Sequence, residues 1–214
     1  MIFIGTLMTK KHLALMKSYK KPIVLMGQQE SDVSCVYFDD YGAAKLATGC
    51  LVRCGCQNIV HLGVTLKDKA AGRARRGGYL DTLEENHIAF REELIAECAG
   101  FTTQDGSDAM AAFLEKQIPF DGVFCATDTI AFEQSTCCAC RNPDSGTGEA
   151  DSSRQQPHVG NLFSPPDFCQ SVHRTGGLEA GAILMDMIQN DNDAVRTAQM
   201  QCRLYEREST GAAE

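Results

Sequence analysis

The sequence predicts an α/β fold built on parallel β-sheets, and two observations support this prediction. Short apolar runs alternate along the chain with amphipathic stretches of about 10 to 15 residues, which is the pattern of βαβ units. Several of the runs are apolar at nearly every position, as in strands whose sheet is covered by helices on both faces. Ligands of such folds bind beyond the carboxyl ends of the strands, so residues that directly follow strands are candidate site residues.

The first two predicted elements are a buried strand over residues 1–4 and a helix over residues 10–20. Gly5 ends the strand, Thr9 is a suitable N-cap for the helix, and Pro22 stops it. The inward face of this helix is predicted to hold Leu13, Met16 and Tyr19.

Two further strands, over residues 23–26 and 34–38, precede a helix over residues 41–53. Gly55 lies where a helix C-terminus favours glycine. The predicted core-facing stripe of the helix consists of Ala43, Leu46, Ala47, Cys50 and Leu51.

The middle of the chain continues the alternation. Strands are predicted over residues 58–62, 93–98 and 121–126, and a Gly- and Arg-rich loop follows the first of them. One helix carries Tyr79, Leu80 and Leu83, a second spans residues 106–117, and a third begins at Asp128.

The pattern is lost over residues 134–170, where no helix or strand period is found. It returns at Gly177 with a helix, and residues 199–205 alternate as a last strand. Residues 210–214 are predicted to be a tail. The inward face of the last helix is predicted to hold Leu178, Gly181, Ala182, Met185 and Ile188.

Composition excludes some classes of protein. The net charge of −8 disfavours nucleic-acid binding by these residues, because such binding depends on Lys and Arg. No apolar run reaches the roughly 18 residues of a membrane span.

The eleven cysteines are dispersed through predicted strands and helices, so we expect reduced thiols in the cytoplasm rather than disulfides. Residues 137–140 contain three cysteines but lack the paired C-x2-C spacing of a zinc site, and no catalytic motif is present.

Several segments, taken in order, resemble the LacI family of transcription regulators and the related periplasmic sugar-binding proteins. The segment Val36–Ala44 resembles the family's strand, acidic turn and small-residue helix, and Leu51–Gly63 resembles its helix end and next strand. The segment Arg75–Leu83 fits the family pattern R-x-x-G-[YF]-x-x-x-L. Phe120–Ala131, Arg174–Gly181 and Cys202–Ser209 extend the resemblance, which covers residues 1–133 and 173–209.

The resemblance implies a periplasmic-binding-protein-like fold of two parallel-sheet subdomains that clamp a small ligand. It implies an incomplete N-subdomain of residues 1–55 and 173–196, and a C-subdomain of residues 56–172 and 197–209. The family's helix-turn-helix headpiece and first βα units have no counterpart in this sequence. Residues 134–172 lack the family's usual helix and acidic strand end, and we hypothesise a frame-disrupted or rearranged coding segment there.

The resemblance and the strand-end rule together single out Arg75, Thr127 and Asp128. The Arg75 guanidinium offers a planar set of donors to sugar hydroxyls or to an acid group, and the alternative is an ion pair with a nearby carboxylate. Asp128 is expected to accept hydrogen bonds from two hydroxyls or to cap the following helix. Thr127 contributes a hydroxyl.

Five more residues are candidates of the same ligand site. Asp39 and Asp40 follow a strand and precede a helix, where a carboxylate either contacts ligand or caps the helix. Tyr41 and Phe132 offer apolar faces to a sugar ring, or simply pack in the core. Thr6 follows the first strand.

The sequence therefore predicts the effector-binding and dimerisation core of a LacI-type regulator. Its partners would be a sugar or sugar phosphate, a second copy of the chain, and DNA only through the headpiece. We expect no cofactor, no metal, no membrane contact and no enzymatic activity. The rivals are a periplasmic-type sugar-binding protein of a transporter, a cysteine-based redox or metal protein, and a non-functional fragment.

Overall fold

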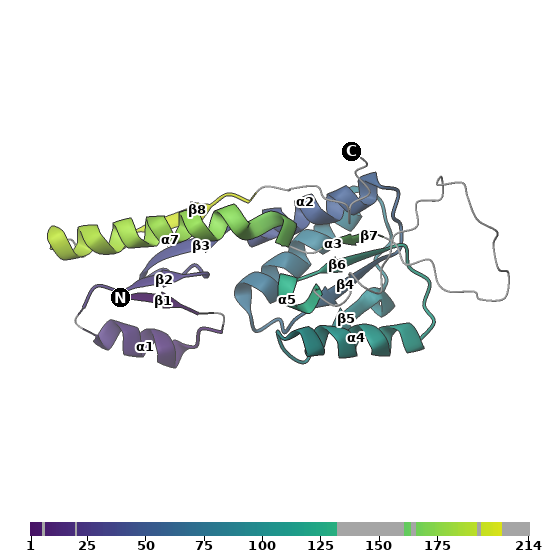
Figure 1. The fold of residues 1–214 in the computed structure, drawn as a ribbon, viewed down its shortest axis with the longest axis horizontal. Coiled ribbons are helices and arrows are strands. Elements are labelled where there is room, and N and C mark those ends of the chain that lie inside the picture. Colours follow the sequence, from purple (N-terminus) through teal and green to yellow (C-terminus); the bar gives the residue numbers. More distant parts are fainter. Residues whose placement is uncertain (6, 20, 132–160, 164–165, 192–193, 203–214) are drawn as a thin grey trace.

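The computed structural model describes residues 1–214 except 6, 20, 132–160, 164–165, 192–193 and 203–214. Two four-stranded sheets, all of whose pairings are parallel, form two lobes (Figure 1). The predicted α/β fold class is confirmed.

The first lobe contains the sheet β1-β2-β3-β8. Its strands are β1 (Ile2–Ile4), β2 (Val24–Met26), β3 (Ser34–Phe38) and β8 (Thr197–Met200). Helices α1 (Lys10–Ser18) and α7 (Pro166–Gln189) cover opposite faces (Figure 1). Because side chains alternate along a strand, Leu25 packs toward Met16 of α1, whereas Val24 packs toward Ala180 and Ile183 of α7.

The second lobe contains the sheet β5-β4-β6-β7. Its strands are β4 (Ile59–Gly63), β5 (Ile95–Glu97), β6 (Gly122–Cys125) and β7 (Asn161–Phe163). Its helices are α2 (Asp40–Arg53), α3 (Arg75–Glu85), α4 (Thr103–Glu115) and α5 (Asp128–Ala131), with a π-helix η1 (Lys69–Ala74) and a 3-10 turn η2 (Glu92–Leu94).

The core of the second lobe has two layers. Ile59 and Phe124 pack with Leu51 of α2 and Tyr79 of α3 on one face of the sheet. On the other face Val60, Leu62 and Val123 pack with Met110 and Phe113 of α4. The predicted Gly- and Arg-rich loop is wrong for residues 69–74, which form η1 directly before α3.

The structure differs from the expected subdomain boundaries at two places. Helix α2, expected in the first subdomain, packs against α3 and shares a core cluster with β4 and β6 of the second lobe. Strand β8, expected in the second subdomain, pairs with β3 in the first sheet, with Val36 beside Ala198. The chain therefore crosses to the second lobe at residues 39–40 and returns to the first lobe between β7 and the part of α7 that packs on β2 and β3.

The predictions for residues 1–4 and 134–172 also need correction. Strand β1 is not buried: it is an edge strand, and Ile4 is 74% exposed. Strand β7 and the start of α7 lie within the stretch where no element was expected. The Cys137–Cys140 cluster and the tail lie outside the described residues, so the hypothesis of a rearranged coding segment is not tested.

Some predicted helix faces are rotated. The buried face of α7 holds Gly176, Ala180 and Ile183, whereas Leu178, Met185 and Ile188 are exposed. In α2, Ala44 is buried and Leu46 is exposed, and in α1 Tyr19 is exposed. The predicted N-cap Thr9 is confirmed, because its side chain accepts a hydrogen bond from the His12 amide.

The contact between α2 and α3 depends on one glycine. A Cβ added at Gly78 would overlap the backbone oxygen of Tyr41 and come within 2.9 Å of the Ala44 Cβ. Backbone cannot rotate away as a side chain can, so the two helices must separate to admit a methyl group.

We expect Gly78→Ala to lower the free energy of unfolding by about 2 kcal/mol, measured by urea denaturation. Gly77→Ala is the matched control, because a Cβ there meets only the Tyr41 ring at 3.7 Å. That control should stabilise the protein by about 0.5–1 kcal/mol through helix propensity. Equal effects of both substitutions would contradict the close approach of α2 to α3.

Candidate functional site

Three chain segments meet where strands of the two sheets end. Strand β3 runs directly into Asp39 and Asp40 at the start of α2, and β6 runs into Thr127 and Asp128 at the start of α5. Arg75 is the first residue of α3. We call these five residues the strand-end site.

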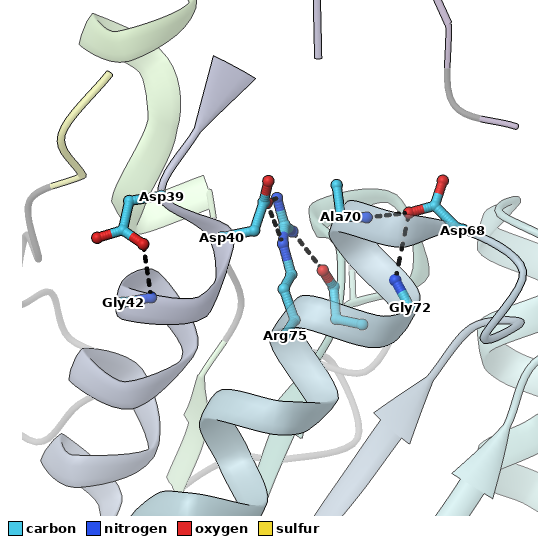
Figure 2. A network of polar contacts seen from close by, with 8 residues as sticks. Asp39, Asp40, Gly42, Asp68, Ala70, Gly72 and Arg75 are labelled. Carbon is cyan, nitrogen blue, oxygen red and sulfur yellow. Dashed lines mark hydrogen bonds and ion pairs between the residues drawn. The ribbon is translucent and has the colours of Figure 1, made fainter. Parts of the chain in front are cut away.

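Arg75 ties these segments together (Figure 2). Its Nε donates a hydrogen bond of 2.8 Å to Oδ1 of Asp40, and its Nη2 lies 2.7 Å from the same oxygen. Its Nη1 donates to the carbonyl oxygen of Ala126, at the end of β6. The ion pair that was the alternative role of Arg75 is therefore present, and it fixes the guanidinium between two strand ends.

Asp40 is 7% exposed at its side chain, so the ion pair with Arg75 is largely removed from water. Desolvating two charges is costly unless both are well bonded, and the guanidinium here also bonds to a carbonyl. Arg75 and Asp40 thus form a fixed polar pair at the strand ends.

Two other aspartates at this edge act as helix caps (Figure 2). The Asp39 carboxylate accepts a 3.0 Å hydrogen bond from the Gly42 amide, which is the capping alternative foreseen for this residue. Asp68, which the sequence analysis missed, accepts from the amides of Ala70 (2.9 Å) and Gly72 (3.3 Å) and is buried. Its position before Lys69 at a helix start was the available signal.

Thr127 and Asp128 lie beside the Ala126 carbonyl that Arg75 contacts. The Thr127 hydroxyl oxygen is buried and has no hydrogen-bond partner among the described residues. A hydroxyl in this state is a natural partner for a polar ligand, because an unpaired buried polar atom is unfavourable.

Of the remaining candidate residues, only Tyr41 is described, and its hydroxyl points away from the strand-end site. Tyr41 lies on the seam between α2 and α3, where its hydroxyl donates a 2.6 Å hydrogen bond to Asp81. That bond stabilises the neutral phenol and raises the pKa of Tyr41. Thr6 and Phe132 lie outside the described residues.

A buried histidine lies on β4. His61 is enclosed by Tyr79 and Phe124, with ring centroids 5.1 and 5.5 Å away, and neither of its ring nitrogens has a hydrogen-bond partner among the described residues. Burial, helped by the nearby charge of Arg76, lowers the pKa of His61 to about 3. His61 is therefore a neutral core residue at physiological pH.

Most of the cysteines whose burial the structure describes are packed in the core, whereas Cys54 is exposed and Cys202 is partly buried. Cys35, Cys50, Cys98 and Cys125 are buried, and burial raises the pKa of the Cys98 thiol to about 11. No group of three metal-ligating side chains occurs in the part of the chain that the structure describes. Within that same part, no helix is both long and apolar enough to cross a bilayer.

Comparisons with known proteins agree with this architecture. Residues 1–208 match the family model described as "Periplasmic binding proteins and sugar binding domain of LacI family". Among curated proteins, the chain is 29% identical over 130 residues to the sucrose operon repressor of Staphylococcus xylosus, which is 61% of this chain and 39% of that protein. It is 35% identical over 101 residues, 47% of this chain and 29% of that protein, to the maltose regulon regulatory protein MalI of Escherichia coli strain K12.

Solved structures show the same fold. A transcriptional regulator CelR–cellobiose complex matches with a TM-score of 0.78 at 21% identity, over 97% of this chain and 64% of that one. The regulator CcpA of Lactococcus lactis matches with a TM-score of 0.74 at 21% identity, over 97% of this chain and 76% of that one. In the comparison with the two curated relatives, the matched part of the chain spans well under half of each relative's length. By its match along residues 1–208, the chain belongs to the family of periplasmic binding proteins and LacI-type sugar-binding domains.

Proposed function

We propose that this chain is the effector-binding core of a LacI-type transcription regulator and that its effector is an uncharged sugar. The names of the relatives support a sugar, since they refer to a sucrose operon, a maltose regulon and a cellobiose complex. The function needs no covalent step and no cofactor: ligand binds reversibly and changes the angle between the lobes.

The observation that carries the proposal is the paired state of Arg75. Its guanidinium is already engaged by Asp40 and by the Ala126 carbonyl, and the neighbouring charged groups of the strand-end site, Asp39 and Asp128, are both carboxylates. A phosphate brought to this edge would face a surplus of negative charge. Sugar hydroxyls, by contrast, donate to carboxylates and accept from a guanidinium.

The remaining parts of the proposal follow from the regulator class. We infer a homodimer in the cytoplasm, as is usual for regulators of this kind. DNA contact is assigned to a separate headpiece, because a chain of net charge −8 supplies few phosphate contacts. The curated relatives named above are regulators, which favours this function over a sugar-binding component of a transporter.

The test is a melting-temperature screen with sucrose, maltose and cellobiose and with their phosphorylated counterparts. A neutral sugar at about one hundred times its Kd should stabilise the protein by about 2.7 kcal/mol, which is a rise of roughly 5–10 °C for a chain of this size. Asp128→Asn should reduce the rise, measured relative to the melting temperature of the same variant without sugar. A rise with sugar phosphates alone would overturn the uncharged effector, and no rise with any sugar would overturn the proposed function.

A further inference from the structure

An ion pair joins the two lobes at the same edge as the strand-end site. The Lys69 ammonium, on η1 of the second lobe, contacts Oε1 of Glu30, in the connection that follows β2 of the first lobe. The pair therefore spans the two halves that a ligand between the strand ends would have to bring together.

Both partners are held by their own lobe. Lys69 is the first residue of η1, which is capped by the buried Asp68 and continues directly into Arg75 of α3. The Glu30 side chain is only 12% exposed, and its backbone oxygen accepts from the Cys35 thiol at 3.7 Å. A movement that opens the lobes at this edge would therefore draw the two charges apart.

We propose that Lys69 and Glu30 form a latch that favours the closed arrangement of the lobes, with Lys69 acting as a positioning residue and not as a ligand contact. The link to ligand affinity rests on the proposed function, whereas the effect on lobe closure does not. A partly exposed pair has a modest strength, but an equilibrium between two arrangements of similar free energy responds to a modest bias. The free energy needed to close the lobes on a ligand would then be smaller, because the ion pair already favours the closed arrangement.

The chain provides a matched control for this pair. Lys17 contacts Asp32 at 2.6 Å within the first lobe, and its side chain is 49% exposed, the same fraction as that of Lys69. Lys17→Met removes the same kind of charge from an ion pair that does not span the lobes, although Asp32 is 64% exposed and Glu30 only 12%. Lys17→Met therefore controls for the loss of a surface lysine charge.

The experiment measures the distance between the lobes in the ligand-free chain by single-molecule fluorescence transfer. Dyes are attached through non-natural amino acids at the exposed positions Leu15 of α1 and Glu115 of α4, so the native cysteines stay untouched. At low salt, Lys69→Met should reduce the ratio of closed to open molecules by about 1.5- to 5-fold. Lys17→Met should leave the ratio unchanged, and about 1 M salt should remove the difference between wild type and Lys69→Met.

Exchanging the two charges tests whether the effect of Lys69→Met comes from the ion pair or from a local structural change at residue 69. Lys69→Glu and Glu30→Lys should each open the lobes, and the double exchange should restore the wild-type ratio. Equal distance distributions for wild type and Lys69→Met at low salt, or failure of the double exchange to restore closure, would overturn the latch. If the latch variants behave as expected but no sugar binds any of them, the proposed function fails and the latch stands.

Discussion

Arg75→Met is expected to lower the free energy of unfolding by about 3–4 kcal/mol and to abolish the rise in melting temperature that a sugar produces. The substitution leaves the Asp40 carboxylate, 7% exposed, without its guanidinium, and it removes the bond to the Ala126 carbonyl at the end of β6. Removing one partner of a largely desolvated ion pair is strongly destabilising, because the remaining charge is poorly hydrated. Urea denaturation measures the loss of stability, and calorimetry with the sugar found in the screen measures the loss of binding.

The double variant Arg75→Met with Asp40→Asn separates the two effects. Since the double variant no longer buries a carboxylate that has lost its guanidinium, we expect it to recover at least half of the lost stability while binding of the sugar stays absent. If Arg75→Met were as stable as wild type, the ion pair would not be desolvated as described. If the stable double variant bound sugar normally, Arg75 would have no part in recognition.

The difference in free energy of unfolding between His61→Leu and wild type is expected to shift in favour of the variant by about 3 kcal/mol when the pH falls from about 7.5 to 4. The pKa of His61 is about 3 in the folded protein, against an ordinary value of 6.5. Below pH 6.5 the unfolded chain binds a proton at this residue and the folded chain does not, so stability is lost as the pH falls from 6.5 toward 3. The slope is about 1.4 kcal/mol per pH unit, and leucine removes it.

The measurement is the free energy of unfolding of wild type and His61→Leu between about pH 7.5 and pH 4. Both proteins lose stability through their carboxylates, so the informative quantity is the difference between the two curves, which should widen below pH 6.5. His87→Asn is the control, because His87 is exposed and its positive φ of 57° suits asparagine. Parallel curves for wild type and His61→Leu would show that His61 is protonated within the folded protein.

Local signals predicted most of the elements and the strand ends that form the candidate site. The apolar run at residues 34–38, the N-cap at Thr9 and the glycine at residue 55, whose φ is 90°, all act within a few residues of themselves. For the same reason Asp39, Thr127 and Asp128 were correctly placed directly after strands. Whether these residues bind ligand remains a prediction.

The helix faces, the placement of α2 and the ion pairs that the sequence did not predict all depend on contacts between residues far apart in the chain. Helix α7 has two apolar faces, and periodicity cannot tell that the sheet takes Ala180 and Ile183 while Leu178 and Met185 stay exposed. Helix α2 follows a strand of one lobe but packs on the other, which no property of its own sequence distinguishes. The pairing of Arg75 with Asp40 joins residues 35 positions apart, and that of Lys69 with Glu30 joins residues 39 apart.

The early crossing of the chain makes the turn at Asp39 and Asp40 a pivot. Strand β3 is anchored in one sheet by β2 and β8, and α2 is anchored in the other half by α3, so the backbone torsions at these two residues must take up part of any relative rotation of the lobes. Any molecule that touches either carboxylate therefore also constrains the joint. If the proposed sugar contacts either carboxylate, a substitution at Asp39 or Asp40 should alter ligand affinity and the movement of the lobes together.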